Sequence, residues 1–266
     1  RKALTLKLRG GWRRVQNLPE RKAAFDRRVT LLAFVDGRGK PRVVLCHLIC
    51  HPVFDPPGAA GTDVPGAVRG LMARQHGDDL GVIWLQGFTG DIRPNLIHRP
   101  SGAKDRLLEM LIGSRFRPSV TGDRDHAATL VFWAIEKALA SAEPCPEAPL
   151  EAVRDTLPVP TVSGRDSGRS LDLTAWRLAP AVRLLFANGE MLSGLAPHDG
   201  TISVGYSNGM IGYVAPDSEP PRGGYEIDGF LRRFGLEERF APDIGSRFLA
   251  VRREMLGRVD RAGAAG

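Results

Sequence analysis

Two histidines in one apolar run are the first residues that could bind a metal ion. His47 and His51 are four positions apart, and on a helix both imidazoles would share one face. The neighbouring Val43, Val44 and Ile49 instead favour a strand, along which such positions lie about 13 Å apart. Zinc holds nitrogen ligands at about 2 Å, so only one of the two can bind it. We expect that ligand to be His51, at the open strand end, and His47 to be a hydrogen-bonded core histidine.

An aspartate follows in a segment that predicts the start of a helix. Asp63 lies in the sequence Gly-Thr-Asp-Val-Pro-Gly, with the proline in the first turn. Its carboxylate could cap the helix by accepting backbone N–H groups. It could equally accept the free ring N–H of His51 and fix the imidazole, as the partners of metal-bound histidines do. The local sequence fits both roles.

A glycine-rich loop, residues 87–95 with the sequence GFTGDIRPN, directly follows an apolar run. Such loops bring backbone N–H groups to the end of a strand, where binding sites are often built. Asp91 and Arg93 are the ionisable side chains of this loop. The alternative interpretation is a tight turn in which the Asp91 carboxylate bonds its own backbone, with Arg93 pointing into solvent.

Further oxygen donors follow apolar runs in the C-terminal half. Glu190 lies in Asn-Gly-Glu after residues 182–187, where a carboxylate could bind zinc or simply be solvated. Asn208 and Tyr213 lie in the segment SNGMIGY, and Tyr225 follows. Two of the three tyrosines in the chain are therefore in this region. Their hydroxyls could bind a metal ion or a carbonyl oxygen, or lie in the core with a hydrogen-bond partner.

The elements that must position these residues follow from the apolar pattern. Short runs of β-branched and aromatic residues bounded by turn residues predict strands, and longer alanine-rich stretches predict helices. In the first half we expect strands at 29–36, 42–51 and 80–85, with helices at 64–76 and 127–142. In the second half we expect strands at 152–157, 170–178, 181–187, 201–206 and 211–214, with a closing helix at 241–258.

Strands outnumber helices in this pattern, and several neighbouring strands suit antiparallel pairing. We therefore expect a mixed α/β or α+β sandwich, with mixed, largely antiparallel β-sheet layers flanked by helices rather than a doubly wound parallel sheet. Residues 1–266 are expected to form a single catalytic-type domain. Its two halves are residues 1–143, with His51 and the loop at 90–95, and residues 150–266, with Glu190 and Tyr213.

The chain has 266 residues, of which 42% are hydrophobic, and a formal net charge of +7. No apolar run reaches the roughly 18 residues that a transmembrane helix needs. The positive charge could attract anionic lipid or nucleic acid, but the arginines are scattered and no nucleic-acid-binding motif is present. We therefore expect no nucleic-acid partner and leave contact with a membrane surface open. Cytoplasmic and exported locations both fit, because no signal peptide is recognisable at the start.

Taken in order, these segments resemble the motifs of the neutral/alkaline, non-lysosomal ceramidase family of lipid metabolism and its bacterial relatives. The family has a strand-end His-Pro or His-Ser/Thr, then Ser/Ala-x-Asp-x-x-Gly, Gly-Asp-x-x-Pro-Asn, Gly-Glu, Ser-Asn-x-x-x-x-Tyr and Tyr-Glu. The matching segments are His51-Pro52, 61–66, 90–95, Gly189-Glu190, 207–213 and Tyr225-Glu226. Each motif is short, but their order is specific. One departure is Gly61, which stands where the family has serine or alanine.

The resemblance implies zinc-dependent hydrolysis of a linear amide. In the family two histidines, a glutamate and a tyrosine hold the zinc ion, and the matching ligands in this chain are His51, Glu190 and Tyr213. A further tyrosine, matching Tyr225, bonds the substrate carbonyl. The metal would activate a water molecule to attack that carbonyl, and the tyrosine hydroxyl would stabilise the charge that develops on its oxygen.

The resemblance also places other side chains in the site. Asp63 and Asp91, the aspartates of the second and third motifs, are expected among the catalytic residues. Asn208 and Arg93 are expected, together with Tyr225, to contact an N-acyl amide substrate. The ceramidases carry serine at the position of Arg93, where a guanidinium instead presents a fixed cation. We therefore expect an anionic or strongly polar substrate to be preferred over ceramide.

One part of the family pattern is not in this sequence. The remaining zinc histidine and a nearby histidine that acts as general base belong to an upstream Thr-His-x-His segment, which the 266 residues do not contain. We therefore expect an N-terminally incomplete catalytic domain that is inactive by itself. The alternatives are a catalytically dead relative that binds a ligand or partner, and, from the net charge, a nonspecific binder of anions or lipid surfaces.

Overall fold

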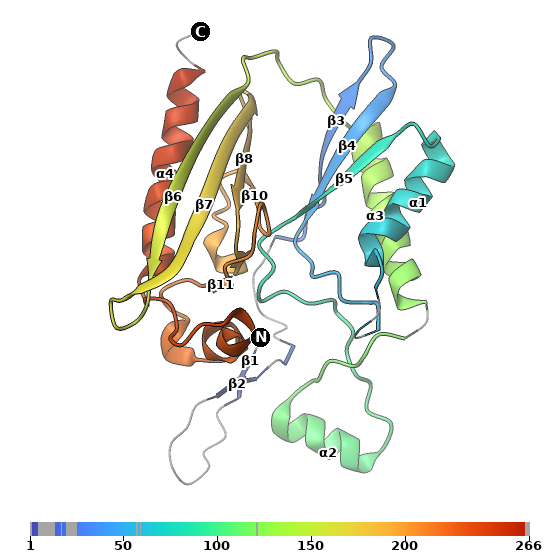
Figure 1. The fold of residues 1–266 in the computed structure, drawn as a ribbon. Helices are drawn as coiled ribbons and strands as arrows, with labels where there is room; N and C mark the ends of the chain where they lie inside the picture. The colour runs from blue at the N-terminus through green and yellow to red at the C-terminus, as the bar shows by residue number, and fades with distance from the viewer. Residues whose placement is uncertain are drawn as a thin grey trace.

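Three strands of the N-terminal half form the first sheet of the computed structural model, which describes residues 2–4, 14–16, 18–19, 26–56, 58, 60–120 and 122–263. β3 (Thr30–Val35) pairs antiparallel with β4 (Pro41–Leu48), and β5 (Gly81–Gln86) adds parallel to β4. A parallel neighbour needs a crossover connection, which contains α1 (Asp63–His76). Together with α3 (Asp123–Ala140), α1 covers one face of this sheet (Figure 1). Fully buried side chains fill the space between, among them Val44, Cys46, Val68, Met72 and Ile135.

Four strands of the C-terminal half form the second sheet. β6 (Glu151–Pro160), β7 (Asp166–Ala179) and β8 (Val182–Ala187) pair antiparallel in sequence, and β10 (Ile202–Val204) adds parallel to β8. The long amphipathic helix α4 (Ile244–Ala262) lies on the outer face of this sheet (Figure 1). The core there consists of fully buried apolar side chains, among them Leu171, Leu173, Leu185, Phe248 and Met255.

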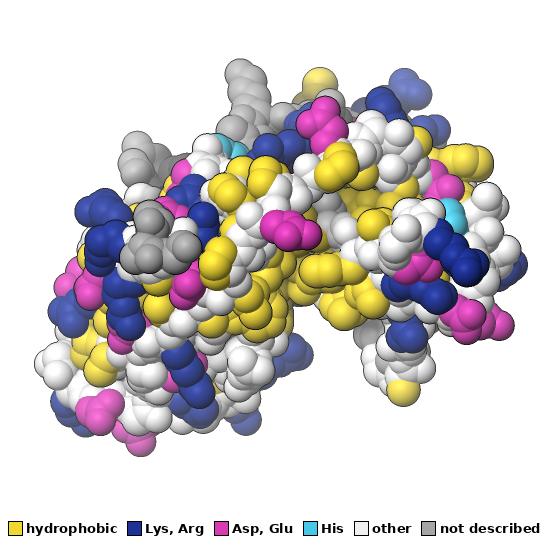
Figure 2. Space-filling model, turned by 90° about the horizontal axis from the view of Figure 1, so that it is seen from above, with side chains coloured by type: hydrophobic (Ala, Val, Ile, Leu, Met, Phe, Trp, Pro, Cys, Tyr) yellow, Lys and Arg dark blue, Asp and Glu magenta, His cyan; other side chains and the backbone are white. Residues whose placement is uncertain are grey.

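The inner faces of the two sheets pack against each other. Leu85 of β5 is buried in one cluster with Leu184, Ile202 and Val204 from the second sheet. The chain therefore forms four layers, with helices outside and two sheets inside, as Figure 1 shows. Seen from above, hydrophobic side chains gather along the notch between the two halves (Figure 2). This apolar joint fixes the two sheets relative to each other.

Short elements complete the described part of the chain. β9 (Glu190–Met191) pairs parallel with β11 (Tyr213–Val214), and β1 (Lys2–Leu4) pairs antiparallel with β2 (Arg14–Gln16). α2 (Ala103–Ile112) projects from the first half (Figure 1). The remaining turns of helix are η1 (Ser193–Leu195), η2 (Pro220–Arg222), η3 (Tyr225–Gly229), which is a π-helical turn, and η4 (Leu231–Phe234).

The structure confirms the predicted fold class of mixed, largely antiparallel sheets flanked by helices in a single domain. The prediction for residues 42–51 was wrong at its end, because β4 stops at Leu48 and leaves His51 in the following loop. The helix α2 was not predicted. No helix among the described residues is both long and apolar enough to cross a membrane. Most of the start of the chain, where a signal peptide was sought, lies outside the described residues.

The buried cysteines give a test of this fold. Burial raises the pKa of the Cys46 thiol to about 12 and, helped by Asp63, that of Cys50 to about 11, whereas Cys145 is exposed. The thiolate is the reactive form of a cysteine. In the native protein, one thiol per chain should therefore react rapidly with a thiol reagent at pH 8. The variant Cys145→Ser should lose that rapid reaction, and denaturant should expose the other thiols. Rapid reaction of two or more thiols in the native protein would contradict the packing of β4 or of the loop that follows it.

Candidate functional site

Glu190 and Tyr213 are brought together by a two-residue parallel ladder. In the β9–β11 pairing, Glu190 is the direct partner of Tyr213, and the Glu190 N–H donates to the Gly212 carbonyl at 2.9 Å. The Tyr213 hydroxyl lies close enough to the Glu190 carboxylate that this carboxylate, after burial, raises the pKa of the hydroxyl. This carboxylate is buried, with only 7% of the residue exposed. Backbone pairing therefore fixes both oxygen donors at one point.

His51 reaches the same point from the other half of the molecule. Its Nε2 lies 3.3 Å from Glu190 Oε1. Its other ring nitrogen, Nδ1, lies 3.3 Å from the Tyr206 hydroxyl and 3.4 Å from Thr89 Oγ1. The structure thus brings together the three side chains that the sequence singled out as metal ligands, one nitrogen and two oxygen donors. Whether they bind a metal ion stays a prediction.

A network of polar side chains holds the loop that carries His51. Gln86, the last residue of β5, donates its amide N–H groups to the Cys50 carbonyl at 2.9 Å and to Thr89 Oγ1 at 3.1 Å. Trp84 Nε1 donates to Gln86 Oε1 at 3.0 Å, which fixes the orientation of the amide. The imidazole is therefore held through Thr89 by a chain of hydrogen bonds that begins in the sheet.

Tyr206 and Thr89 are the site residues that sequence reasoning missed. Tyr206 adopts φ 57°, which is unusual for a residue with a side chain, and such strain is often found at functional sites. It directly precedes the segment SNGMIGY and is the one tyrosine of the chain that the sequence analysis did not single out. Its position beside a recognised motif was the signal that could have found it. Thr89 offered no such signal beyond its place in the glycine-rich loop.

Burial of the site favours the neutral forms of the His51 imidazole and of the Tyr206 and Tyr213 hydroxyls, which lie beside the Glu190 carboxylate. Burial, and then the nearby Arg93 cation, lower the pKa of His51, so the imidazole is neutral at neutral pH and its contact with Glu190 is not an ion pair. Burial, and then Glu190, raise the pKa of the Tyr206 and Tyr213 hydroxyls. A neutral imidazole beside a buried carboxylate suits a bound cation.

Two glycines let the chain segments approach closely enough to build the site. A Cβ at Gly87 would lie 2.8 Å from Ile49 Cγ1 and 3.0 Å from the Leu48 carbonyl oxygen. A Cβ at Gly205 would lie 3.1 Å from the Gly189 carbonyl oxygen. Side chains at these positions would therefore separate the ends of strands that meet there.

Asp63 contacts the site indirectly. Its carboxylate accepts the N–H groups of Phe54 and Asp55, both at 2.8 Å, and that of Val64 at 2.7 Å. It therefore ties the start of α1 to the loop that follows His51. Of the two roles left open by the sequence, the contacts favour a structural one at the start of α1, and the ring nitrogens of His51 face other groups.

Asp91 likewise acts as a brace. Its carboxylate accepts the Ser193 N–H at 2.7 Å and the Ser193 hydroxyl at 3.0 Å. The Gly90 N–H donates to the Met191 carbonyl at 2.9 Å. The glycine-rich loop is thereby fastened beside β9, which carries Glu190. Of the alternative interpretation, the tight turn is present, because the Ile92 N–H donates to the Thr89 carbonyl at 2.9 Å, but the Asp91 carboxylate bonds Ser193 rather than its own backbone among the contacts of the described residues.

The predicted substrate-binding side chains are all at the surface. Tyr225 is 40% exposed, and the centroid of its ring lies 5.6 Å from that of Tyr213. Asn208 is exposed, with φ 61°. Arg93 is also exposed, and its guanidinium carbon lies 5.6 Å from the ring centroid of Phe116. These side chains are accessible to a ligand.

A groove with a volume of about 550 Å³ begins at Pro52, the residue that follows His51. Arg93 lies in its wall, and Phe54, Leu96 and Phe116 make it partly apolar. The donor side chains themselves are not part of its lining. A ligand in the groove could therefore bring one end to His51 while the remainder lies beside Arg93.

His47 lies away from the candidate site, as expected. It is buried, and its Nε2 lies 3.1 Å from the Ser203 carbonyl oxygen, on the neighbouring sheet. Burial lowers the pKa of His47, so the ring is neutral and donates this hydrogen bond. The expectation of a hydrogen-bonded core histidine is confirmed.

Comparison with known proteins gives a result for the fold alone. The sequence matches no known family profile and no curated protein. The structure is similar to the neutral ceramidase from Pseudomonas aeruginosa, with a TM-score of 0.61 at 13% identity over 85% of this chain and 45% of that one. It is similar to a ceramidase complexed with C2, with a TM-score of 0.62 at 13% identity over 85% and 46% of the two chains. The fold is therefore ceramidase-like, and the chain spans less than half the length of these structures.

The close approach at Gly87 generates a stability prediction. Gly87→Ala should lower the free energy of unfolding by about 1–3 kcal/mol, because the added methyl group overpacks the junction with β4. Gly70→Ala is the matched control, since its nearest atom, Arg74 Nη1, would be 3.9 Å away, and alanine on α1 should add about 0.5–1 kcal/mol. Urea denaturation measures both changes. Equal effects of the two substitutions would contradict the junction.

Proposed function

We propose that this chain is the catalytic part of a zinc-dependent hydrolase of linear amides. The observation that carries the proposal is the 3.3 Å contact between His51 Nε2 and Glu190 Oε1, with Tyr213 directly opposite Glu190 in the β9–β11 pairing. The ceramidase-like fold supports the same reaction class. Bound zinc would supply a Lewis acid for the amide carbonyl and for the attacking water.

The donor set fits zinc in both chemistry and spacing. Imidazole nitrogen and carboxylate oxygen are regular zinc ligands at about 2.0–2.2 Å in tetrahedral sites, in which adjacent donors lie about 3.3–3.5 Å apart. His51 and Glu190 have this separation. The described residues contain no cluster of three or more His, Cys, Asp and Glu side chains that could hold a metal ion. Tyr213 is therefore needed as the third ligand in the proposed site.

The remaining side chains have separate tasks in the proposed reaction. Tyr206 and Thr89 hold the His51 ring through its second nitrogen, which keeps Nε2 directed at Glu190. Tyr225 has an exposed hydroxyl beside Tyr213 and can donate a hydrogen bond to the carbonyl oxygen of a substrate. Such a donor stabilises the negative charge that develops as the carbonyl is attacked.

We propose an N-acyl amide with an anionic or strongly polar group as the substrate. The groove beside Pro52 combines apolar walls with the exposed Arg93 guanidinium. The other arginine in its lining, Arg117, is already bonded to both oxygens of Asp123 at 2.6 and 2.8 Å. Arg93 makes no ion pair within the described residues, so its cation is available to a carboxylate or phosphate.

A second candidate function is ligand binding without turnover. Among the described residues, no second histidine contacts His51. His47, His76 and His98 are bonded instead to Ser203, Glu136 and Asp105. A general base for the attacking water is therefore not evident in the described part of the chain, although the groove and Arg93 could still bind an anionic ligand.

Zinc affinity gives the first test of the proposed function. The chain should bind zinc weakly and release it to a chelator, because three protein ligands hold the ion less firmly than four. His51→Ala and Glu190→Gln should each weaken binding by about tenfold or more, as measured by calorimetry on the folded variants. The exposed His126 provides the control, since His126→Gln should bind like the unmodified protein. Unchanged affinity in His51→Ala would show that the ligand set is wrong.

Substrate preference gives the second test, made on the complete gene product. Arg93→Ser should lower kcat/KM for anionic N-acyl amides by roughly tenfold to hundredfold, the size of a lost charge-assisted hydrogen bond. Neutral N-acyl amides should change much less. Tyr225→Phe should lower kcat for both substrate classes, because it removes a donor to the carbonyl. Ceramide turnover that Arg93→Ser leaves unaffected would reject the substrate, and binding of the anionic compounds without hydrolysis would favour the second function.

A further inference from the structure

α2 stands away from the body of the molecule on two short chain segments, residues 96–98 and 115–117, which we call the neck. The His98 N–H donates to the Arg115 carbonyl, and the Arg117 N–H donates to the Leu96 carbonyl, both at 2.8 Å. Ile97 and Phe116 form an antiparallel bridge between these bonds. Figure 1 shows the helix beyond this neck, apart from both sheets. The neck fixes the helix without covering it.

The inward-facing residues of α2 are acidic. Asp105 lies 2.5 Å from His98 Nε2 and also pairs with the Arg115 guanidinium. Glu109, one turn later, accepts the Ser114 hydroxyl at 2.8 Å. Both carboxylates are half-buried. Polar contacts with the neck, rather than apolar packing, therefore orient this helix.

The outward-facing residues of α2 are apolar. Leu107 is 54% exposed, Met110 79% and Leu111 71%. Residues three and four positions apart share one face of a helix, so these side chains form a single apolar stripe, which we call the α2 stripe. A helix on a protein surface normally turns such a stripe to the core. An exposed apolar patch of this kind marks an interaction surface.

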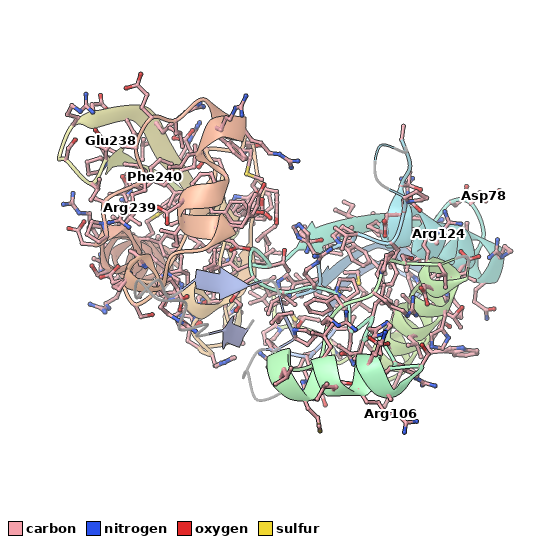
Figure 3. The ribbon with its side chains drawn as sticks, turned by 90° about the horizontal axis from the view of Figure 1, so that it is seen from below. Asp78, Arg106, Arg124, Glu238, Arg239 and Phe240 are labelled. Atoms are coloured by element: carbon pink, nitrogen blue, oxygen red, sulfur yellow. The ribbon has the colours of Figure 1, made fainter. Side chains whose placement is uncertain are left out.

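The charges beside the α2 stripe are basic. Lys104 and Arg106 are exposed on the helix, and Arg99 is exposed just before it. Figure 3 shows Arg106 at the outer edge of the molecule, pointing away from it. Within the described residues none of these three cations has an ion-pair partner, because the acidic groups of the helix face the neck. An apolar stripe flanked by unpaired cations is complementary to an anionic lipid surface.

We propose that α2 docks on an anionic lipid surface, with the α2 stripe in the interfacial region and the flanking cations at the headgroups. Lysine and arginine stems can lie along apolar surface while their charged ends stay in water. Leu96 and Phe116 of the neck also line the groove that begins beside His51. The docking helix would therefore be carried by the same two chain segments that help to line the groove. This inference does not depend on the proposed reaction.

A second copy of the chain fits the α2 stripe less well. In a two-fold dimer the same patch of both copies forms the interface, so the cations Lys104 and Arg106 of both copies would be gathered in it. The helix has 10 residues and is about 15 Å long, which is little surface for an interface that needs roughly 1,000 Å² or more. Lipid headgroups provide opposite charge instead.

Sedimentation with vesicles tests the proposal on the full chain. The protein should bind vesicles of phosphatidylcholine with phosphatidylserine more tightly than vesicles of phosphatidylcholine alone, and salt should weaken the difference. A triple variant with Leu107→Ser, Met110→Ser and Leu111→Ser should bind about tenfold more weakly or worse. A double variant with Leu130→Ser and Leu150→Ser, which changes leucines 59% and 68% exposed elsewhere, is the matched control and should bind normally.

Two further variants separate the charges from the apolar stripe. Lys104→Gln and Arg106→Gln should each lower affinity for the anionic vesicles by about fivefold and affect neutral vesicles little. An environment-sensitive dye on Met110→Cys, in a Cys145→Ser background, should shift to the blue on binding. Vesicle binding that survives the triple variant, or no binding by the unmodified protein, would overturn the proposal. A dimer in solution that the triple variant makes monomeric, without vesicle binding, would assign the stripe to a second copy.

Discussion

The candidate site depends on the junction between the ends of β5 and β10. The Gly205 N–H donates to the Gln86 carbonyl at 2.9 Å, and Gly87 forms a bridge with Val204. These bonds join two sheets that come from different halves of the chain. Residues 87 and 205 are glycines, so the backbones at the ends of β5 and β10 can approach closely. The loop after β4 therefore faces the turn that carries Glu190. Without that junction His51 and Glu190 would belong to separate layers.

The chemistry of the site follows from burying one carboxylate among neutral groups. A buried charge is costly unless it is paired or hydrogen-bonded, and Glu190 is contacted by His51 and lies directly opposite Tyr213 in the β9–β11 pairing. The sequence analysis placed Asp63 and Asp91 among the expected catalytic residues. In the structure their carboxylates brace the two loops that carry these groups. A braced, largely neutral donor set around a carboxylate is preorganised for a cation.

Local patterns predicted the elements well and the long-range pairings poorly. β-branched runs and turn residues gave the hairpin of β3 and β4, and the alanine-rich stretch gave α3. The pairing of Glu190 with Tyr213 rests on two-residue strands, which have no periodicity, so it could be inferred only through the family resemblance. Tyr206 was missed because it lies one residue before the motif that was recognised, and its unusual φ leaves no mark in the sequence. α2 was missed because its apolar residues face solvent and its acidic residues face the neck.

X-ray absorption at the zinc edge of the metal-loaded chain tests the central claim most directly. The account predicts a first coordination sphere of nitrogen and oxygen only, with the scattering signature of one imidazole. That signature should vanish in His51→Ala and remain in His126→Gln. A sphere containing sulfur from Cys46 or Cys50, or an imidazole signature that persists in His51→Ala, would contradict the account.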